Sequence, residues 1–225
     1  MSDIKTAIKD YFKQPNFKSR LLIMLLGVFL LGFCLSFLLR VNFGTDPCSF
    51  MNLTISRRLG ILFGTVQVLL NAFLLIFVLI WGRSYIGLGS LANMCLTGYI
   101  ADFFGWIWDN VLPANIFTDI TPRIIIFAPA FCLFVLGGAL YTNADMGVAP
   151  YDAIPLMIKR DILKKAPFFL IRMSYDFLVL LIGILLGGSA YLPVLGAVLM
   201  VLLLGPVIQV VGGFLRKHNV GGTNV

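Results

Sequence analysis

The sequence is poor in the residues from which metal sites and acyl-transfer sites are built. Its one histidine, His218, lies in the C-terminal tail, so the chain has neither a histidine cluster nor a Ser/His/Asp set. The cysteines show no C-x-x-C spacing and three of them lie inside apolar runs, which favours free thiols; they are Cys34, Cys48, Cys95 and Cys132. We therefore expect no enzymatic activity, no metal and no cofactor.

Charge is scarce as well. Only 12% of the residues are charged, 60% are hydrophobic and the mean hydropathy is +0.98, values typical of a chain dissolved in lipid. The formal net charge of +7 does not indicate a nucleic-acid partner, because the basic residues stand in short clusters between apolar runs. The partner predicted first is the lipid bilayer.

Long apolar runs are what the sequence has instead. Each is about as long as the roughly 20 residues with which an α-helix crosses a bilayer; the runs cover 21–40, 61–81, 86–107, 124–142, 167–187 and 192–214. The first run follows basic residues, as in a signal peptide, but it is of membrane-spanning length and no A-x-A site follows it. The pattern predicts an all-α integral membrane protein with six transmembrane helices, the first of them uncleaved.

The basic residues between these runs predict the orientation, because loops rich in lysine and arginine stay in the cytoplasm. One face receives the N-terminal cluster, Arg83, the cluster at 159–165 and the pair Arg216 and Lys217. The opposite face receives Arg40, Arg57, Arg58 and Arg123. We expect both termini in the cytoplasm.

The two halves of the chain resemble each other. At an offset of 103 residues Gly44 falls on Gly147 and Pro47 on Pro150. At an offset of 105 Gln67 falls on Arg172 and Asn71 on Asp176, and at 107 three glycines superimpose: 89, 98 and 105 on 196, 205 and 212. Each repeat carries three spans, so the second must cross the membrane in the opposite sense to the first.

This repeat divides the chain into five segments. We expect a basic cytoplasmic segment at 1–20, a first repeat at 21–108, an extracytoplasmic linker at 109–123, a second repeat at 124–214 and a cytoplasmic tail at 215–225. In many transporters built from inverted repeats the binding site lies between the repeats at the bilayer midplane.

Each repeat has a Gly-x-x-Pro element after its first span. Glycine permits a turn with positive φ and proline suits the first position of a helix, so Gly44, Pro47, Gly147 and Pro150 predict a turn followed by a short helix. Two interpretations stay open: a helix lying on the membrane surface, and a broken re-entrant helix that lines a cavity. Pro155 should shorten or kink the second copy.

Polar residues inside the spans are the candidates for a site. Asp176 lies about 13 Å along the fifth span, near the middle of a hydrocarbon core about 30 Å thick, and Arg172 lies one turn earlier on the same face. The two can form a purely structural pair, or Arg172 can bind a carboxylate or phosphate while Asp176 binds a cation or a coupling proton. Asn71 and Gln67 occupy the matching positions of the other repeat. Asp102, near the end of a span, is expected at the interface.

The elements "NFGTDPCSF" and "DMGVAPYDA", together with the repeated glycines, resemble the YczE/YitT-like family of bacterial integral membrane proteins. The family pattern of Gly-x-x-Pro, an aromatic residue and Asp is met by Gly147, Pro150, Tyr151 and Asp152, whereas the first copy has cysteine and serine there. The resemblance implies a bacterial plasma-membrane protein of the shorter YczE-like type, without the cytosolic domain of YitT-type members. It adds Tyr151 and Asp152 to the expected substrate-binding residues.

The leading hypothesis is a small secondary transporter or exporter of a polar or charged small molecule that works by alternating access of the two repeats. A second is a membrane regulator or assembly factor that binds a protein partner and transports nothing. A third is a channel or scaffold of aquaporin-like inverted design, which needs both Gly-x-x-Pro helices to enter the membrane. The substrate stays unidentified and the chain can form a homo-oligomer.

Overall fold

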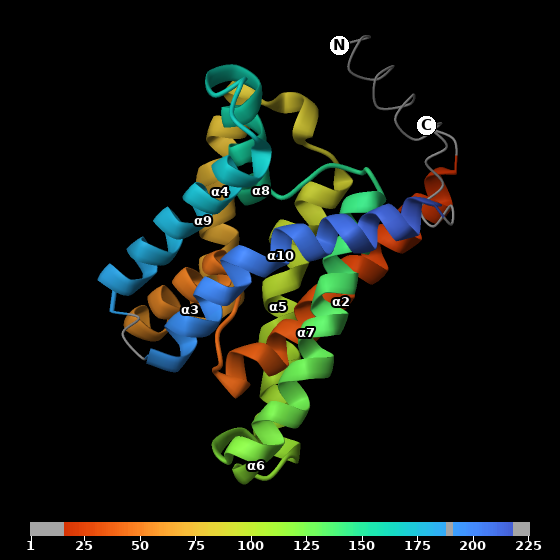
Figure 1. Ribbon diagram of the computed structural model, residues 1–225. Helices are drawn as coiled ribbons and strands as arrows, with labels where there is room; N and C mark the ends of the chain where they lie inside the picture. The colour runs from red at the N-terminus through yellow and green to blue at the C-terminus, as the bar shows by residue number, and fades with distance from the viewer. Residues whose placement is uncertain (1–15, 188–190, 218–225) are drawn as a thin grey trace.

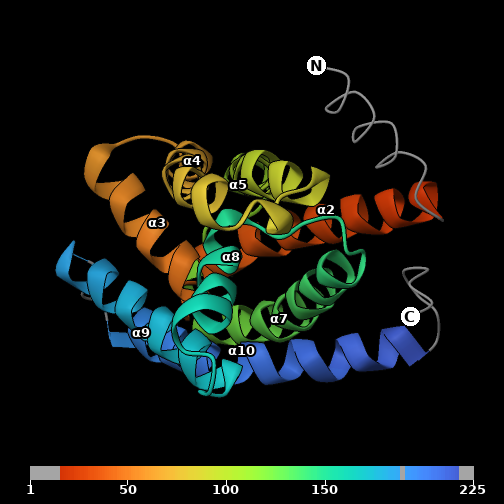
Figure 2. The ribbon, with the colours of Figure 1, turned by 90° about the horizontal axis from the view of Figure 1, so that it is seen from above.

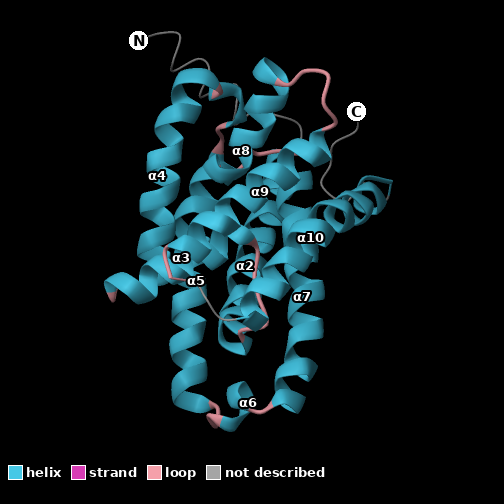
Figure 3. Ribbon diagram, turned by 60° about the vertical axis from the view of Figure 1, so that its left-hand side comes forward, coloured by secondary structure: helices cyan, strands magenta, loops and turns pink. Residues whose placement is uncertain are grey.

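The computed structural model describes residues 16–187 and 191–217, with the side chains of 191, 192, 203–206, 208, 209, 215 and 216 left out. Within this part of the chain every regular element is a helix (Figures 1 and 3). The helices are α2 (Phe17–Val41), α3 (Pro47–Leu59), α4 (Phe63–Trp81), the 3₁₀ turn η1 (Arg83–Tyr85), α5 (Leu88–Val111), α6 (Asn115–Thr118), α7 (Ile120–Asn143), α8 (Pro150–Met157), the π-helical turn η2 (Ile158–Ile162), α9 (Phe168–Leu185) and α10 (Tyr191–Lys217).

Four of these helices are long and apolar enough to cross a membrane: α2, α4, α7 and α9. They coincide with four of the six expected spans, so a multi-pass helical membrane protein is confirmed. The other two expected spans are also long helices, α5 and α10. In α10 the continuous apolar part found among the described residues is Pro193–Leu202.

The helix boundaries follow the sequence repeat. At an offset of 103 residues α2 falls on 120–144, where α7 lies, and α3 falls on 150–162, which α8 and η2 occupy together. At an offset of 105, α4 falls on 168–186, where α9 lies. At an offset of 107, α5 falls on 195–218, which α10 covers except for the last residue. Seen from above, α4 and α5 lie on one side, α9 and α10 on the opposite side, and α2 and α7 between them (Figure 2).

The central helices α2 and α7 are joined at both ends by matching arginines. At the start of α2, Arg20 donates to the carbonyl of Ala144 at 2.9 Å and to that of Asp145. Arg123, which is 103 residues further on, donates from the start of α7 to the carbonyl of Val41 at 2.8 Å. Each guanidinium thus satisfies carbonyls left without a partner at the other helix's end, and the two helices lie antiparallel.

Both Gly-x-x-Pro elements form the turn that the sequence predicts. Gly44 has φ +116° and Gly147 has φ +94°, in the region that favours glycine. Proline then takes the first turn of α3 and of α8. Asp46 caps α3 by accepting a hydrogen bond from the backbone N–H of Ser49 at 3.0 Å. Pro155 lies inside α8, which ends at Met157 and passes into the π-helical turn η2, so the second copy is shortened as expected.

The repeated glycines hold each turn against the last helix of the other repeat. A Cβ on Gly89 would meet the carbonyl oxygen of Gly147 at 2.8 Å, and the N–H of Gly89 donates to the carbonyl of Met146 at 2.7 Å. In the other half, a Cβ on Gly196 would collide with the carbonyl of Phe43. Only glycine allows these backbones to approach so closely, which gives the superimposed glycines a packing role.

The structure differs from the expected segments at several boundaries. The first helix begins at Phe17 rather than at residue 21, because Arg20 is part of the contact with α7. The linker expected at 109–123 is shortened to 112–119 and contains α6, because α5 continues past 107, where Trp108 donates to the Ser36 hydroxyl at 2.8 Å. Residues 1–15 and 218–225, which hold most of both expected terminal segments, lie outside the described residues.

The end of α5 provides a pH-dependent contact outside the expected spans. Arg40 donates to both carboxylate oxygens of Asp109, at 2.8 and 2.5 Å, and this hydrogen bonding holds the pKa of Asp109 below its ordinary value. A depressed pKa stabilises the folded state above the unfolded-state pKa of about 4 and the effect is lost as the pH falls. We therefore expect the difference in melting temperature between wild type and Asp109→Asn to shrink as the pH falls from about 4 through the lower pKa of folded Asp109. A difference that stays constant from pH 7 to pH 3 would contradict this assignment.

Candidate functional site

The second long helix of the second repeat, α9, carries an arginine shared by two carboxylates. On α9, Arg172 donates from Nε to Asp176 at 2.9 Å, one helical turn away, and from Nη1 to Asp152 of α8 at 2.7 Å. Arg172 therefore joins α8 to α9 and does more than pair within its own helix. Two nitrogens of the guanidinium, Nε and Nη1, thus donate to carboxylate oxygens on two elements.

The start of α8 completes this group. The Tyr151 hydroxyl donates to the second carboxylate oxygen of Asp176 at 2.7 Å, and the guanidinium of Arg172 lies 5.4 Å from the centre of the Tyr151 ring. Tyr175 packs against the same ring with a centroid distance of 4.9 Å. We refer to Arg172, Asp176, Asp152 and Tyr151 as the central cluster.

Helix α4 reaches the central cluster through one residue. Asn71 is buried, and its side-chain oxygen accepts a hydrogen bond from the backbone N–H of Tyr151 at 3.3 Å, so it caps the N-terminus of α8 from another helix. Gln67 lies one turn away and contacts α5 instead, where it donates to the carbonyl of Asn93 at 3.5 Å. The structure thus places Asn71 at the cluster and Gln67 beside it, directed toward α5.

Asp102, expected near the end of its span, lies well inside α5 and has a capping role. Its carboxylate accepts a hydrogen bond from the backbone N–H of Gly64 at 2.7 Å, at the start of α4. This contact satisfies one of the N–H groups that the first turn of a helix leaves free, and a carboxylate is favoured at that end of the helix dipole. Asp102 therefore connects α4 and α5.

Helix α3 contributes a buried polar face that faces the interior. Ser49, Asn52 and Ser56 recur along it and are 7%, 0% and 8% exposed. Among the described residues the side-chain oxygen of Asn52 has no hydrogen-bond partner, while its amide donates to the sulfur of Cys48 at 3.6 Å. The sequence showed this polar face but not its burial, and Cys48 stands at the repeat position of Tyr151.

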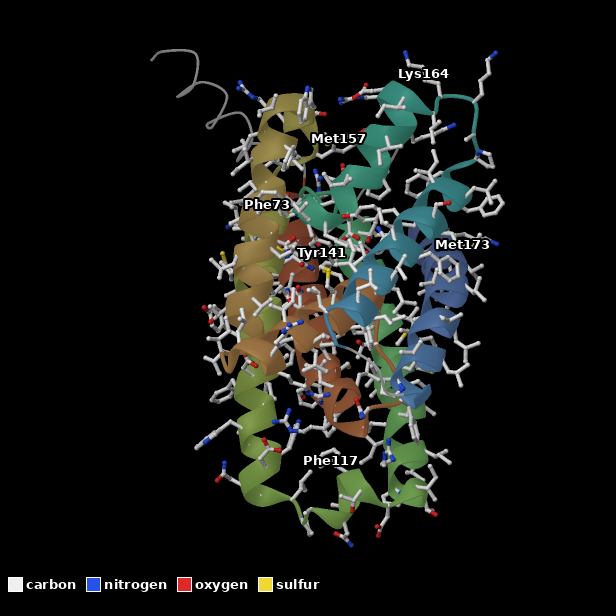
Figure 4. The ribbon with its side chains drawn as sticks, turned by 90° about the vertical axis from the view of Figure 1, so that its left-hand side faces the viewer. Phe73, Phe117, Tyr141, Met157, Lys164 and Met173 are labelled. Carbon is white, nitrogen blue, oxygen red and sulfur yellow. The ribbon has the colours of Figure 1, made fainter. Side chains whose placement is uncertain are left out.

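The central cluster is partly open to its surroundings. The side chains of Arg172 and Asp152 are 25% and 36% exposed, whereas that of Asp176 is 8% exposed. Nearby, Tyr141 lies in the middle of the bundle, where its hydroxyl donates to the carbonyl of Gly89 (Figure 4). One arginine faces two carboxylates, so the group carries an excess negative charge when both are ionised. Such a group can accept a cation or a proton at Asp152 without losing the Arg172–Asp176 pair.

Two hollows lie beside α3, away from the central cluster. One of about 490 Å³ is bordered by α2, α3, the end of α9 and Pro193; the other, of about 420 Å³, lies between α3 and the α4–α5 pair. Arg57 and Leu53 border both. None of the binding residues expected from the sequence lines either hollow.

Residues 18–212 match the model of a family of unknown function, DUF6198. The chain belongs to DUF6198. It is 27% identical to the membrane protein YczE of Bacillus subtilis strain 168 over 133 residues, which make up 59% of this chain and 59% of YczE. It is 26% identical to YyaS of the same organism over 193 residues, 86% of this chain and 92% of that protein. The resemblance to YczE that the Gly-x-x-Pro elements indicated is thus confirmed. No solved structure matches this DUF6198 chain.

Proposed function

We propose that the chain forms six spans in two inverted three-helix halves, with both termini in the cytoplasm of a bacterium. The antiparallel α2 and α7, joined by Arg20 and Arg123, support this arrangement because they are the first helices of the two repeats. We also propose that α3 and α8 are re-entrant. A helix lying on the surface turns its polar face to water, whereas the polar face of α3 is buried.

We propose further that the protein is a small secondary transporter or exporter of a polar or charged molecule. The observation that carries this proposal is Arg172 held between Asp176 and the half-open Asp152, at the point where α8 begins. Ionisable groups inside spans mark ion and substrate pathways, and broken helices line such sites in transporters. Asp152 and Asp176 would bind a coupling cation or proton, and Arg172 and Tyr151 would orient the substrate.

A difference between the two repeats supports a mechanism with two states. Gly82 and Gly187 are equivalent, as are Thr54 and Met157. Met157 packs on Gly82, where a Cβ would meet its sulfur at 2.6 Å, and Figure 4 labels Met157 between α8 and the end of α4. Among the residues that the structure describes, a Cβ on Gly187 would meet nothing within 4 Å, and the larger hollow lies there. Alternating access requires a second state in which the open side is closed and the filled side is open.

The test is solute-driven proton movement in proteoliposomes loaded with pyranine, with amino acids, dicarboxylates and quaternary amines as probes. A probe that moves protons with wild type should lose at least about tenfold in rate with Arg172→Ala and Asp176→Asn, since both remove a group of the central cluster. Lys164→Ala, on the exposed loop after η2, is the control and should keep the wild-type rate. Full rates in both cluster variants would overturn the proposal.

The rival function is a membrane regulator that binds a protein partner. It is favoured by one observation, namely that Arg172 already has a carboxylate on each side, as in a purely structural network. Under that function wild type moves no protons with any probe, and Lys164→Ala in the exposed basic segment at 159–165 weakens partner binding while the cluster variants keep it.

A further inference from the structure

The larger hollow beside α3 has the shape and lining of a ligand site. Its volume of about 490 Å³ falls within the range of small-molecule pockets. Phe50, Leu53 and Leu186 form an apolar wall, while Thr54, Arg57 and Arg58 lie on the polar side. No carboxylate is among the lining residues, so the charge of the hollow is positive.

The two arginines lack a counter-ion within the described part of the chain. No carboxylate there lies within ion-pair distance of Arg57, and Arg58 donates only to the carbonyl of Leu186, at 3.1 Å. The smaller hollow, which Arg57 also borders, contains Asp102 and Asp109. Both are engaged elsewhere, Asp102 with the N–H of Gly64 and Asp109 with the side chain of Arg40.

The equivalent positions of the second repeat are built differently. At the offset of 103 residues, Arg57 and Arg58 correspond to Arg160 and Asp161, which pair with each other at 2.7 Å. The space is also filled there, because Met157 takes the place that Thr54 leaves open. One fold position thus carries a neutral pair against a filled space in one half, and two positive charges beside an open hollow in the other.

We propose that this hollow binds a small amphiphilic anion. Its carboxylate or phosphate is held by Arg57 and Arg58, and its short apolar chain lies against Phe50, Leu53 and Leu186. Arginine suits this role because its planar guanidinium donates two parallel hydrogen bonds to such groups. The anion can be a free metabolite or the headgroup of an anionic lipid. The site does not depend on transport through the central cluster.

The experiment uses the purified full chain in dodecyl maltoside and isothermal titration with hexyl phosphate. We expect one saturable site per chain and at least about tenfold weaker binding in Arg57→Gln, because one charged anchor is lost. Arg58→Asp copies the pair of the second repeat and should abolish binding by giving Arg57 an internal partner. Thr54→Met copies Met157 and should weaken binding by filling the hollow without changing charge.

The controls separate this site from general attraction to a basic protein. Arg160→Gln removes a guanidinium that is already paired and should bind hexyl phosphate as wild type does. A competition between dioctanoyl phosphatidylglycerol and dioctanoyl phosphatidylcholine distinguishes a lipid headgroup from a free anion. If only phosphatidylglycerol displaces hexyl phosphate, the site binds a lipid headgroup. If neither lipid displaces it, the site binds a free anion. Equal affinities for hexyl phosphate in wild type, Arg57→Gln and Arg58→Asp, or no binding to wild type, would overturn the proposal even if the central cluster transports.

Discussion

Replacing Arg172 with Gln is expected to lower the free energy of unfolding by about 3 kcal/mol, the lower end of the range for breaking a buried ion pair. The substitution leaves two carboxylates facing each other without their shared cation, and Asp176 is only 8% exposed. The effect stays at the lower end because the side chain of Asp152 is 36% exposed and can still be solvated. Urea unfolding in mixed micelles, followed by tryptophan fluorescence, measures the change.

A double variant shows whether this loss comes from charge. Asp176→Asn removes one carboxylate but keeps an oxygen that can accept from the Tyr151 hydroxyl. We expect Arg172→Gln combined with Asp176→Asn to be more stable than Arg172→Gln alone, because only the half-open Asp152 then stays charged. A double variant as unstable as the sum of the two single ones would mean that packing of the long arginine side chain, not charge, holds α8 and α9 together.

Replacing Gly147 with Ala is the second change with a large expected effect, about 3 kcal/mol of stability. The positive φ costs a residue with a Cβ about 1–2 kcal/mol, and crowding of a packed site costs about 1–3 kcal/mol more. The crowding arises because the new Cβ would lie 2.7 Å from the Cα of Gly87 and 2.8 Å from the Ser90 hydroxyl oxygen. The turn cannot move away, since the N–H of Gly89 donates to the carbonyl of Met146.

Gly60 is the matched control for Gly147. It also has a positive φ, +65°, but a Cβ there would meet none of the described residues within 4 Å. Gly60→Ala should therefore cost only the conformational part, about 1 kcal/mol. The difference between the two variants measures the close contact between the turn and the start of α5. Equal losses in stability would show that backbone conformation alone requires glycine at 147.

The helices could be predicted from the sequence more completely than the central cluster. Apolar length and the repeat offsets are properties of neighbouring residues along the chain, so they located the helices and the Gly-x-x-Pro turns to within a few residues. The pairing of Arg172 with Asp176 was also foreseeable, because residues four apart share a helix face. The same reasoning could not reach Asp152, which lies 20 residues before Arg172 and approaches it only when α8 packs beside α9.

Other contacts depended on which way a side chain turns. Asn71 and Gln67 lie one turn apart on α4, yet Asn71 meets the N–H of Tyr151 and Gln67 turns toward the carbonyl of Asn93. Periodicity placed both on one face, but the choice between neighbours was made by the helices that pack there, α8 and α5. Asn52 was recognisable as part of a polar face, and only the packing of α3 within the helix bundle buried it.

The sequence alone predicts a multi-pass helical membrane protein of two similar halves, each with a turn that needs glycine and proline. It can do so because the length of an apolar run and the conformation of a turn are encoded by neighbouring residues. Tertiary structure alone decided that the halves are not equivalent. Met157 fills the space beside Gly82 while the matching space at Gly187 stays open, and Arg160 has its aspartate while Arg57 has none within the described residues. The physical reason is that a few side-chain differences between the repeats decide which spaces are filled and which charges are paired. Whether a space is filled or a charge is paired depends on contacts between helices far apart in the chain.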